Sequence, residues 1–112
     1  MAMTLDQLRI LGSNSGCRMF LSKPYGLEML LVLDTFEKED ADNGIDDTFD
    51  TILLNRPRRA AFSNFVEQLV THKYLTKSMS KKKRSKFILR ASTDIQNHLN
   101  ICCSLGTNHK SA

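Results

Sequence analysis

The chain has 112 residues, of which 41% are hydrophobic, and its formal net charge is +4. This length fits one domain with its own core, and the hydrophobic content excludes an intrinsically disordered chain. The longest apolar run, residues 29–33, is far shorter than the roughly 20 residues that cross a bilayer, and residues 1–11 lack the basic start of a signal peptide. We therefore expect a single cytoplasmic domain, residues 1–112, with no membrane partner.

The charge is divided unevenly along the chain. Residues 1–50 hold four Lys and Arg against ten Asp and Glu, a net charge of −6. Residues 51–112 hold twelve Lys and Arg against two Asp and Glu, a net charge of +10. A basic half of this kind is typical of a surface that binds an anionic partner such as nucleic acid.

The first predicted element is an N-terminal arm, residues 1–22. Leucines at positions 5, 8 and 11 have the spacing of one helix face, which predicts a helix over residues 4–11. Residues 12–16 are Gly, Ser and Asn only, and they predict a break after this helix.

A central helix is predicted next. Pro24 is expected in its first turn, where proline is favoured. The broad apolar face of residues 27–36 indicates that this helix lies in the core. Residues 37–44 are rich in acids and predict a solvated loop that ends in an Asn-Gly turn.

Two helices separated by a tight break follow the acidic loop. A short helix is predicted over residues 45–54 and a second over residues 57–72, with Asn55 or Arg56 as its cap and Pro57 in its first turn. The second helix has an apolar inner face and a polar, Arg-rich outer face. This order is typical of a helix-turn-helix motif.

The C-terminal part predicts a hairpin and a last helix. Strand-forming residues flank a polar turn at residues 80–85, so the hairpin covers residues 74–90. The last helix begins near residue 92, and residues 106–112 are expected to be a flexible tail. The complete order predicts an α+β fold that is mainly α: a winged helix-turn-helix with a two-stranded β-hairpin wing.

Basic residues gather at the start of the second helix of this motif and on the hairpin. Positive charge at a helix N-terminus opposes the helix dipole, so three arginines there indicate an anionic partner rather than only a solvated helix end. A basic hairpin tip fits a DNA backbone or a minor groove, its alternative being a solubilising loop. The candidate DNA-binding residues are Arg56, Arg58, Arg59, Ser63, Asn64, Lys77, Lys81, Lys82, Lys83, Arg84 and Lys86.

Residues 24–92 resemble the MarR/SarA type of winged-helix transcriptional regulators. The segment RPRRAAFSNFVEQLVTHKYL resembles that family's recognition helix running into its first wing strand, and SKKKRSKFILRAS resembles its wing. Arg84 matches the wing arginine, whereas Lys83 stands where the family has Asp and Lys73 where it often has Gly. The resemblance implies a homodimer whose terminal helices pack across a two-fold axis.

The sequence contains no catalytic or phosphate-loop motif, so we expect neither an enzyme nor a cofactor. His98, Cys102 and Cys103 have at most the spacing of half a zinc site, and we expect no metal. The cysteines are expected to be reduced thiols, with a redox switch at Cys17, beside Arg18, as the alternative. A small-molecule effector is left open.

The sequence therefore predicts a nucleoid-associated transcriptional regulator that binds double-stranded DNA. Helix 57–72 would read the major groove, and hairpin 74–90 would contact the backbone or the minor groove. Two alternatives are left open: an architectural or partitioning DNA binder without sequence specificity that uses the same surface, and a winged-helix protein-interaction module, for which the acidic residues 37–50 could form a partner surface. RNA is less favoured, because few aromatic residues are placed to stack on bases.

Overall fold

The computed structural model describes residues 4–79 and 87–111, with side chains to residue 102. The described part contains six helices and two strands, which confirms the predicted mainly helical winged-helix fold. In chain order these are α1 (Leu5–Ser13), α2 (Ser15–Leu21), α3 (Gly26–Lys38), α4 (Ile45–Thr51), α5 (Arg59–Thr71), β1 (Leu75–Met79), β2 (Phe87–Ala91) and α6 (Thr93–Ser111). None of these helices is long and apolar enough to span a membrane.

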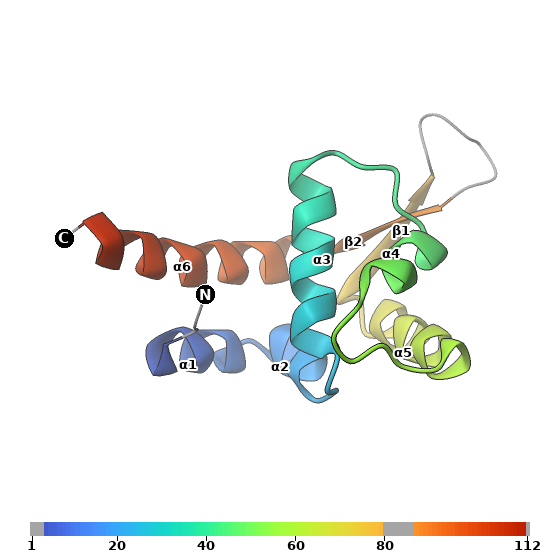
Figure 1. The fold of residues 1–112 in the computed structure, drawn as a ribbon, viewed down its shortest axis with the longest axis horizontal. Coiled ribbons are helices and arrows are strands. Elements are labelled where there is room, and N and C mark those ends of the chain that lie inside the picture. Colours follow the sequence, from blue (N-terminus) through green and yellow to red (C-terminus); the bar gives the residue numbers. More distant parts are fainter. Residues whose placement is uncertain (1–3, 80–86, 112) are drawn as a thin grey trace.

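The elements are arranged along an axis of 47 Å (Figure 1). At one end α1 and α6 lie side by side, and both chain termini are found there (Figure 1). At the other end are α4, α5 and the antiparallel hairpin, in which Leu75 pairs with Ala91 and Met79 with Phe87. Between the two ends stands α3, so the predicted central helix is confirmed.

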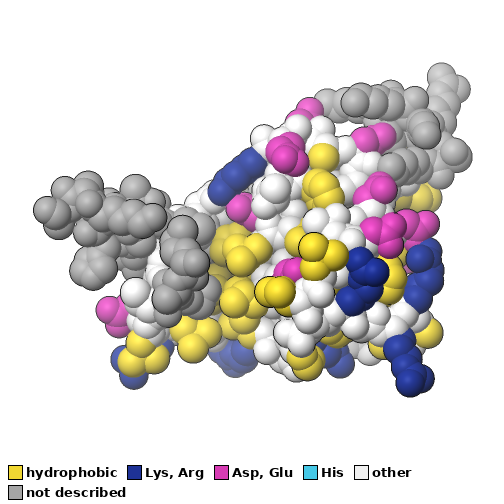
Figure 2. Space-filling model, in the orientation of Figure 1, with side chains coloured by type: hydrophobic (Ala, Val, Ile, Leu, Met, Phe, Trp, Pro, Cys, Tyr) yellow, Lys and Arg dark blue, Asp and Glu magenta, His cyan; other side chains and the backbone are white. Residues whose placement is uncertain are grey.

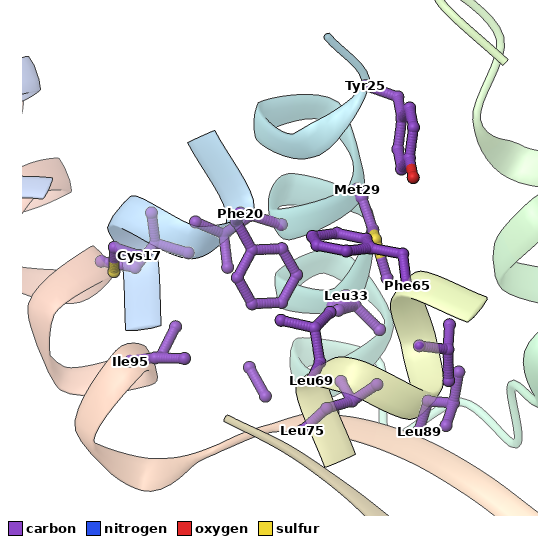
Figure 3. Packing of buried hydrophobic residues seen from close by; sticks show 14 of the residues in the cluster. Cys17, Phe20, Tyr25, Met29, Leu33, Phe65, Leu69, Leu75, Leu89 and Ile95 are labelled. Atoms are coloured by element: carbon purple, nitrogen blue, oxygen red, sulfur yellow. The ribbon is translucent and has the colours of Figure 1, made fainter. Parts of the chain in front are cut away.

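The core lies where α2, α3, α5 and the hairpin meet. Phe20 of α2 and Phe65 of α5 face each other in a T-shaped contact with ring centroids 6.1 Å apart (Figure 3). Tyr25 adds a second T-shaped contact to Phe65 at 5.7 Å. Phe20 is fully buried, and each side chain of this size stabilises the fold by about 2–3 kcal/mol through burial. The core therefore holds α5 firmly from its inner side.

The predicted break over residues 12–16 is a single residue, Asn14. Its backbone N–H donates to the Leu11 carbonyl at 3.2 Å, and its side-chain oxygen accepts from the Cys17 N–H at 2.9 Å. One asparagine therefore ends α1 and caps α2. Gly16 is helical, and a Cβ there would lie 2.6 Å from the Ile95 side chain, so this glycine permits close helix packing rather than a turn.

The central helix begins at Gly26, so the placement of Pro24 in its first turn was wrong. The Gly26 N–H donates to the Lys23 carbonyl at 3.0 Å, which closes a turn around the proline. A Cβ on Gly26 would overlap the Phe20 carbonyl oxygen. The chain thus passes α2 so closely that only glycine fits where α3 starts.

The boundaries of the helix-turn-helix also differ from the prediction. Helix α4 ends at Thr51 instead of residue 54, and α5 begins at Arg59 instead of Pro57. The N-cap is Arg58, with extended φ and ψ of −67° and 148°, and neither Asn55 nor Arg56 caps the helix. Pro57 disfavours helical conformation in Arg56, the residue before it, so α5 cannot readily extend further towards the N-terminus.

The C-terminal helix is longer than predicted. Helix α6 continues to Ser111, so the backbone of residues 106–111, for which a flexible tail was expected, is helical. Gly106 is the only strong helix breaker in this stretch, and one glycine costs about 1 kcal/mol relative to alanine. The predicted hairpin tip, residues 80–85, lies outside the described residues.

Candidate nucleic-acid interface

The outer face of α5 is polar and almost uncharged. Its opposite face is buried through Phe62, Phe65, Val66 and Leu69. Asn64 is exposed, as the sequence predicted for a base-contacting residue, whereas Ser63 is half-buried on the flank. The other exposed side chains of this face are Ala60, Ala61, Glu67, Gln68 and Thr71. A helix of this profile fits a major groove about 12 Å wide.

Arg58 is the most available of the three predicted arginines. It is exposed at the N-cap of α5, and its guanidinium makes no ion pair or hydrogen bond within the described residues. Helix N-termini favour anions through their free N–H groups and dipole. Arg58 therefore lies beside the free N–H groups at the start of α5.

Arg56 instead holds the end of α4. Its guanidinium donates to the Ile52 carbonyl at 2.9 Å and to the Asp50 carbonyl at 2.7 Å. It also lies 5.4 Å from the ring centroid of Phe49, a cation–π distance. The structure thus gives Arg56 contacts that fix the linker, which the sequence did not predict.

Arg59 is bound within the protein as well. Its guanidinium forms an ion pair with Asp46 of α4 and lies 5.7 Å from the Phe49 ring centroid. The ion pair is on the surface, since the Arg59 and Asp46 side chains are 60% and 68% exposed. Figure 2 accordingly shows basic and acidic side chains beside each other on this side of the molecule. Asp46 of α4 therefore supplies part of the negative charge that was expected to come from a bound anion.

Lys77 reaches from β1 to the outer face of α5. Its Nζ lies 2.7 Å from the Glu67 carboxylate, and the Lys77 side chain is 30% exposed. Glu67 is the only acid of α5, so this ion pair neutralises the single negative charge on that face. The remaining predicted hairpin residues, Lys81, Lys82, Lys83, Arg84 and Lys86, lie outside the described residues.

Arg90 of β2 is a structural residue that sequence reasoning missed. Only 14% of its side chain is exposed, and its Nε lies 2.7 Å from Glu37. It also donates to the Ala41 carbonyl at 2.5 Å and to the side-chain oxygen of Asn43. The acidic loop is therefore attached to the hairpin and is not wholly solvated. Its partners lie about 50 positions away along the sequence, which gives no local signal.

Lys73 ends α5 in a left-handed conformation with φ of 63°. Its N–H donates to the Val70 carbonyl at 3.0 Å, and the Tyr74 N–H donates to the Leu69 carbonyl at 2.9 Å. This is the helix end that glycine usually occupies, and the resemblance had placed a glycine position here.

The low-pKa thiol hypothesised beside Arg18 is wrong. Cys17 is fully buried, and burial, aided by the charges of Asp94 and Cys102, raises its pKa to about 11. The Arg18 side chain donates to the Gly12 carbonyl at 3.0 Å instead. A redox switch needs a stabilised thiolate, which this environment opposes. No cluster of three metal-binding side chains occurs in the described part of the chain.

Two apolar areas lie away from α5. A hollow of about 420 Å³ runs over α3 and the linker, where hydrophobic side chains gather in Figure 2. Leu31 and Leu54 line it, and they are 43% and 82% exposed. The second area, on α1 and α6, exposes Leu5, Leu8 and Ile101 by about half of each side chain.

No protein-family model and no curated protein matches the sequence. Among solved structures, a mutant of S. aureus MepR is similar, with a TM-score of 0.58 over 96% of this chain and 80% of that chain. Its sequence is 10% identical, and at this identity the likeness shows the fold alone. The chain thus has the MarR-like winged-helix fold that its sequence resemblance predicted.

Proposed function

We propose that this chain is a DNA-binding transcriptional regulator rather than an enzyme, acting on the nucleoid in the cytoplasm. The observation that carries the proposal is the outer face of α5, where exposed Asn64 and Gln68 follow a helix start that presents Arg58. These exposed polar side chains take no part in the packing of the hydrophobic core. The MarR-like fold supports the same role, and the sequence resemblance assigns the recognition helix to this segment.

The side chains on this face suit particular bases. Asn and Gln pair bidentately with adenine, and alanine methyl groups contact the methyl of thymine. Guanine is read mainly by Arg or Lys, and the only such residue within α5, Arg59, is at its first position, where it is paired with Asp46 in the free protein and is assigned here to the phosphate backbone. The proposed half-site is therefore rich in A·T pairs where α5 enters the groove, with Arg58 and the hairpin on phosphates.

The regulator would act as a homodimer. Leu5 and Leu8 on α1 and Ile101 on α6 are exposed, and the two helices lie side by side at the end opposite α5 (Figure 1). Packing these apolar residues against a second copy would remove them from water. A two-fold dimer would then read a pseudo-palindrome with half-sites about 34 Å apart, or a multiple of that.

A binding selection tests the proposal. The 112-residue chain is titrated by fluorescence anisotropy against a pool of random duplexes at two salt concentrations, and the bound DNA is sequenced. Salt-sensitive binding with an enriched, A·T-rich pseudo-palindrome is the expected result, since each neutralised phosphate contributes about −0.9 to the slope of log K against log salt. Salt-sensitive binding without enrichment would replace the proposal with an architectural role. No binding at either salt concentration would overturn it in favour of a protein partner.

A further inference from the structure

The helix-turn-helix contains an ion pair between its two helices. Asp46 lies in the first turn of α4, and Arg59 is the first residue of α5. Their side chains are 68% and 60% exposed, so both charges are within reach of water and of any bound anion. Exposed ion pairs in water are weak, and an arginine binds a phosphate through the same two-pronged geometry as a carboxylate.

The Phe49 ring keeps Arg59 at this edge of the interface. The guanidinium lies 5.7 Å from the ring centroid, which is a contact that does not depend on Asp46. When the ion pair with Asp46 is broken, the contact with Phe49 therefore keeps Arg59 beside the start of α5. It lies one residue from Arg58, where we have proposed a phosphate.

We propose that Asp46 limits DNA affinity: its carboxylate holds Arg59 in the free protein, and a DNA phosphate displaces it in the complex. This rests on the proposed function. After the exchange, Asp46 is an unpaired negative charge near the DNA backbone, so the phosphate gains a partner at the expense of an existing ion pair. Removing the carboxylate strengthens binding.

Other acids near the interface are differently placed. The Asp47 carboxylate accepts a hydrogen bond from the Gly44 N–H at 3.1 Å, which caps α4. Glu67 is neutralised by Lys77. Asp50 is exposed on α4, one turn after Asp46, and its carboxylate makes no ion pair within the described residues. Asp50 therefore provides a matched control with the same charge on the same helix.

The test compares Asp46→Asn with Asp50→Asn. Both variants lose one negative charge from α4, but only Asp46→Asn releases Arg59. Asp46→Asn should raise affinity for duplex DNA about two- to fivefold at low salt, the range of an exposed ion pair. It should also make the salt slope more negative by up to about 0.9, because no carboxylate is left to take up a cation when Arg59 moves. Asp50→Asn should change affinity less and leave the slope unchanged.

An Arg59→Gln background identifies the partner. In that background Asp46→Asn should behave like Asp50→Asn, since no guanidinium remains to be released. Equal gains from the two single variants, or a gain from Asp46→Asn that persists with Arg59→Gln, would overturn the inference and indicate a general charge effect. Failure of the wild-type protein to bind any duplex would instead overturn the proposed function itself. Circular dichroism and thermal unfolding show that each variant is folded.

Discussion

The Arg90 guanidinium lies 2.7 Å from the Glu37 carboxylate, and this ion pair joins the end of α3 to the second strand of the hairpin. The same side chain holds the loop between α3 and α4 through the Ala41 carbonyl and Asn43. Asn43 is 2% exposed, and its own carbonyl accepts from the Leu89 N–H at 3.0 Å. Arg90 therefore joins the wing to the end of α3 and to the acidic loop, and the Asn43–Leu89 hydrogen bond adds a second link between that loop and β2.

Replacing this arginine should destabilise the fold. Arg90→Ala leaves the Ala41 carbonyl and the Asn43 side chain short of a donor, and we expect a loss of about 2–3 kcal/mol in the free energy of unfolding. Urea unfolding followed by circular dichroism measures it. Lys77→Ala is the control, because the Lys77–Glu67 pair is more exposed and should cost less than about 1 kcal/mol. Equal costs for the two variants would contradict the structural role of Arg90.

Two glycines should respond in opposite ways to alanine. Gly26→Ala places a Cβ onto the Phe20 carbonyl oxygen, so the start of α3 must move. We expect a loss of more than about 3 kcal/mol or failure to fold. Gly12 has nothing within 4 Å of such a Cβ and lies in α1, so Gly12→Ala should stabilise by about 0.5–1 kcal/mol. Thermal unfolding of both variants checks the pair, and tolerance of Gly26→Ala would refute the close approach.

The buried thiol of Cys17 predicts a pH dependence of stability. Its pKa is raised from the ordinary value of 9.0 to about 11, so the unfolded chain loses this proton at lower pH than the folded chain. The stabilising contribution is complete below pH 9 and is lost as the pH rises towards 11. Urea unfolding between pH 8 and 11 should show this loss, and Cys17→Ala should reduce it. Identical pH profiles for the two proteins would contradict the burial.

The same thiol should be unreactive in the folded protein. In a Cys102→Ser, Cys103→Ser variant, Cys17 is the only thiol. At pH 8 the raised pKa alone lowers its thiolate fraction about 100-fold relative to the unfolded chain. Labelling with an alkylating reagent should therefore require urea. Rapid labelling without urea would restore the redox-switch hypothesis that the buried environment opposes.

Specificity and affinity should separate on α5. Asn64→Ala removes a bidentate partner for adenine, and it should relax discrimination at one position of the half-site by about 1–3 kcal/mol. Arg58→Gln should weaken binding to all duplexes alike and reduce the salt slope by about 0.9. Anisotropy titrations against the selected site and against a scrambled duplex measure both. If Arg58→Gln changed specificity and Asn64→Ala did not, the assignment of Asn64 to a base and of Arg58 to a phosphate would be wrong.

The element order was predictable because it depends on local patterns. Residues 62, 65, 66 and 69 repeat with helical period, and they lie within the basic half of the chain. The helix starts near Pro24 and Pro57 were not predictable, since one depends on the approach of Gly26 to Phe20 and the other on an extended Arg58. Nor does any local pattern reveal that Arg59 is paired with Asp46, because this requires the crossing of α4 and α5.

Asn14 has a mechanical consequence for the proposed dimer. It is the only residue between α1 and α2, so any rotation of one helix against the other must be absorbed by two backbone torsions. Its side chain is 7% exposed, and its Nδ2 donates to Asp94 of α6 at 2.6 Å. Helices α1 and α2 are thus expected to move together, because the one residue that links them is held by hydrogen bonds. A shift of α1 and α6 would carry α2 with it, pressing Phe20 against Phe65 on the inner side of α5.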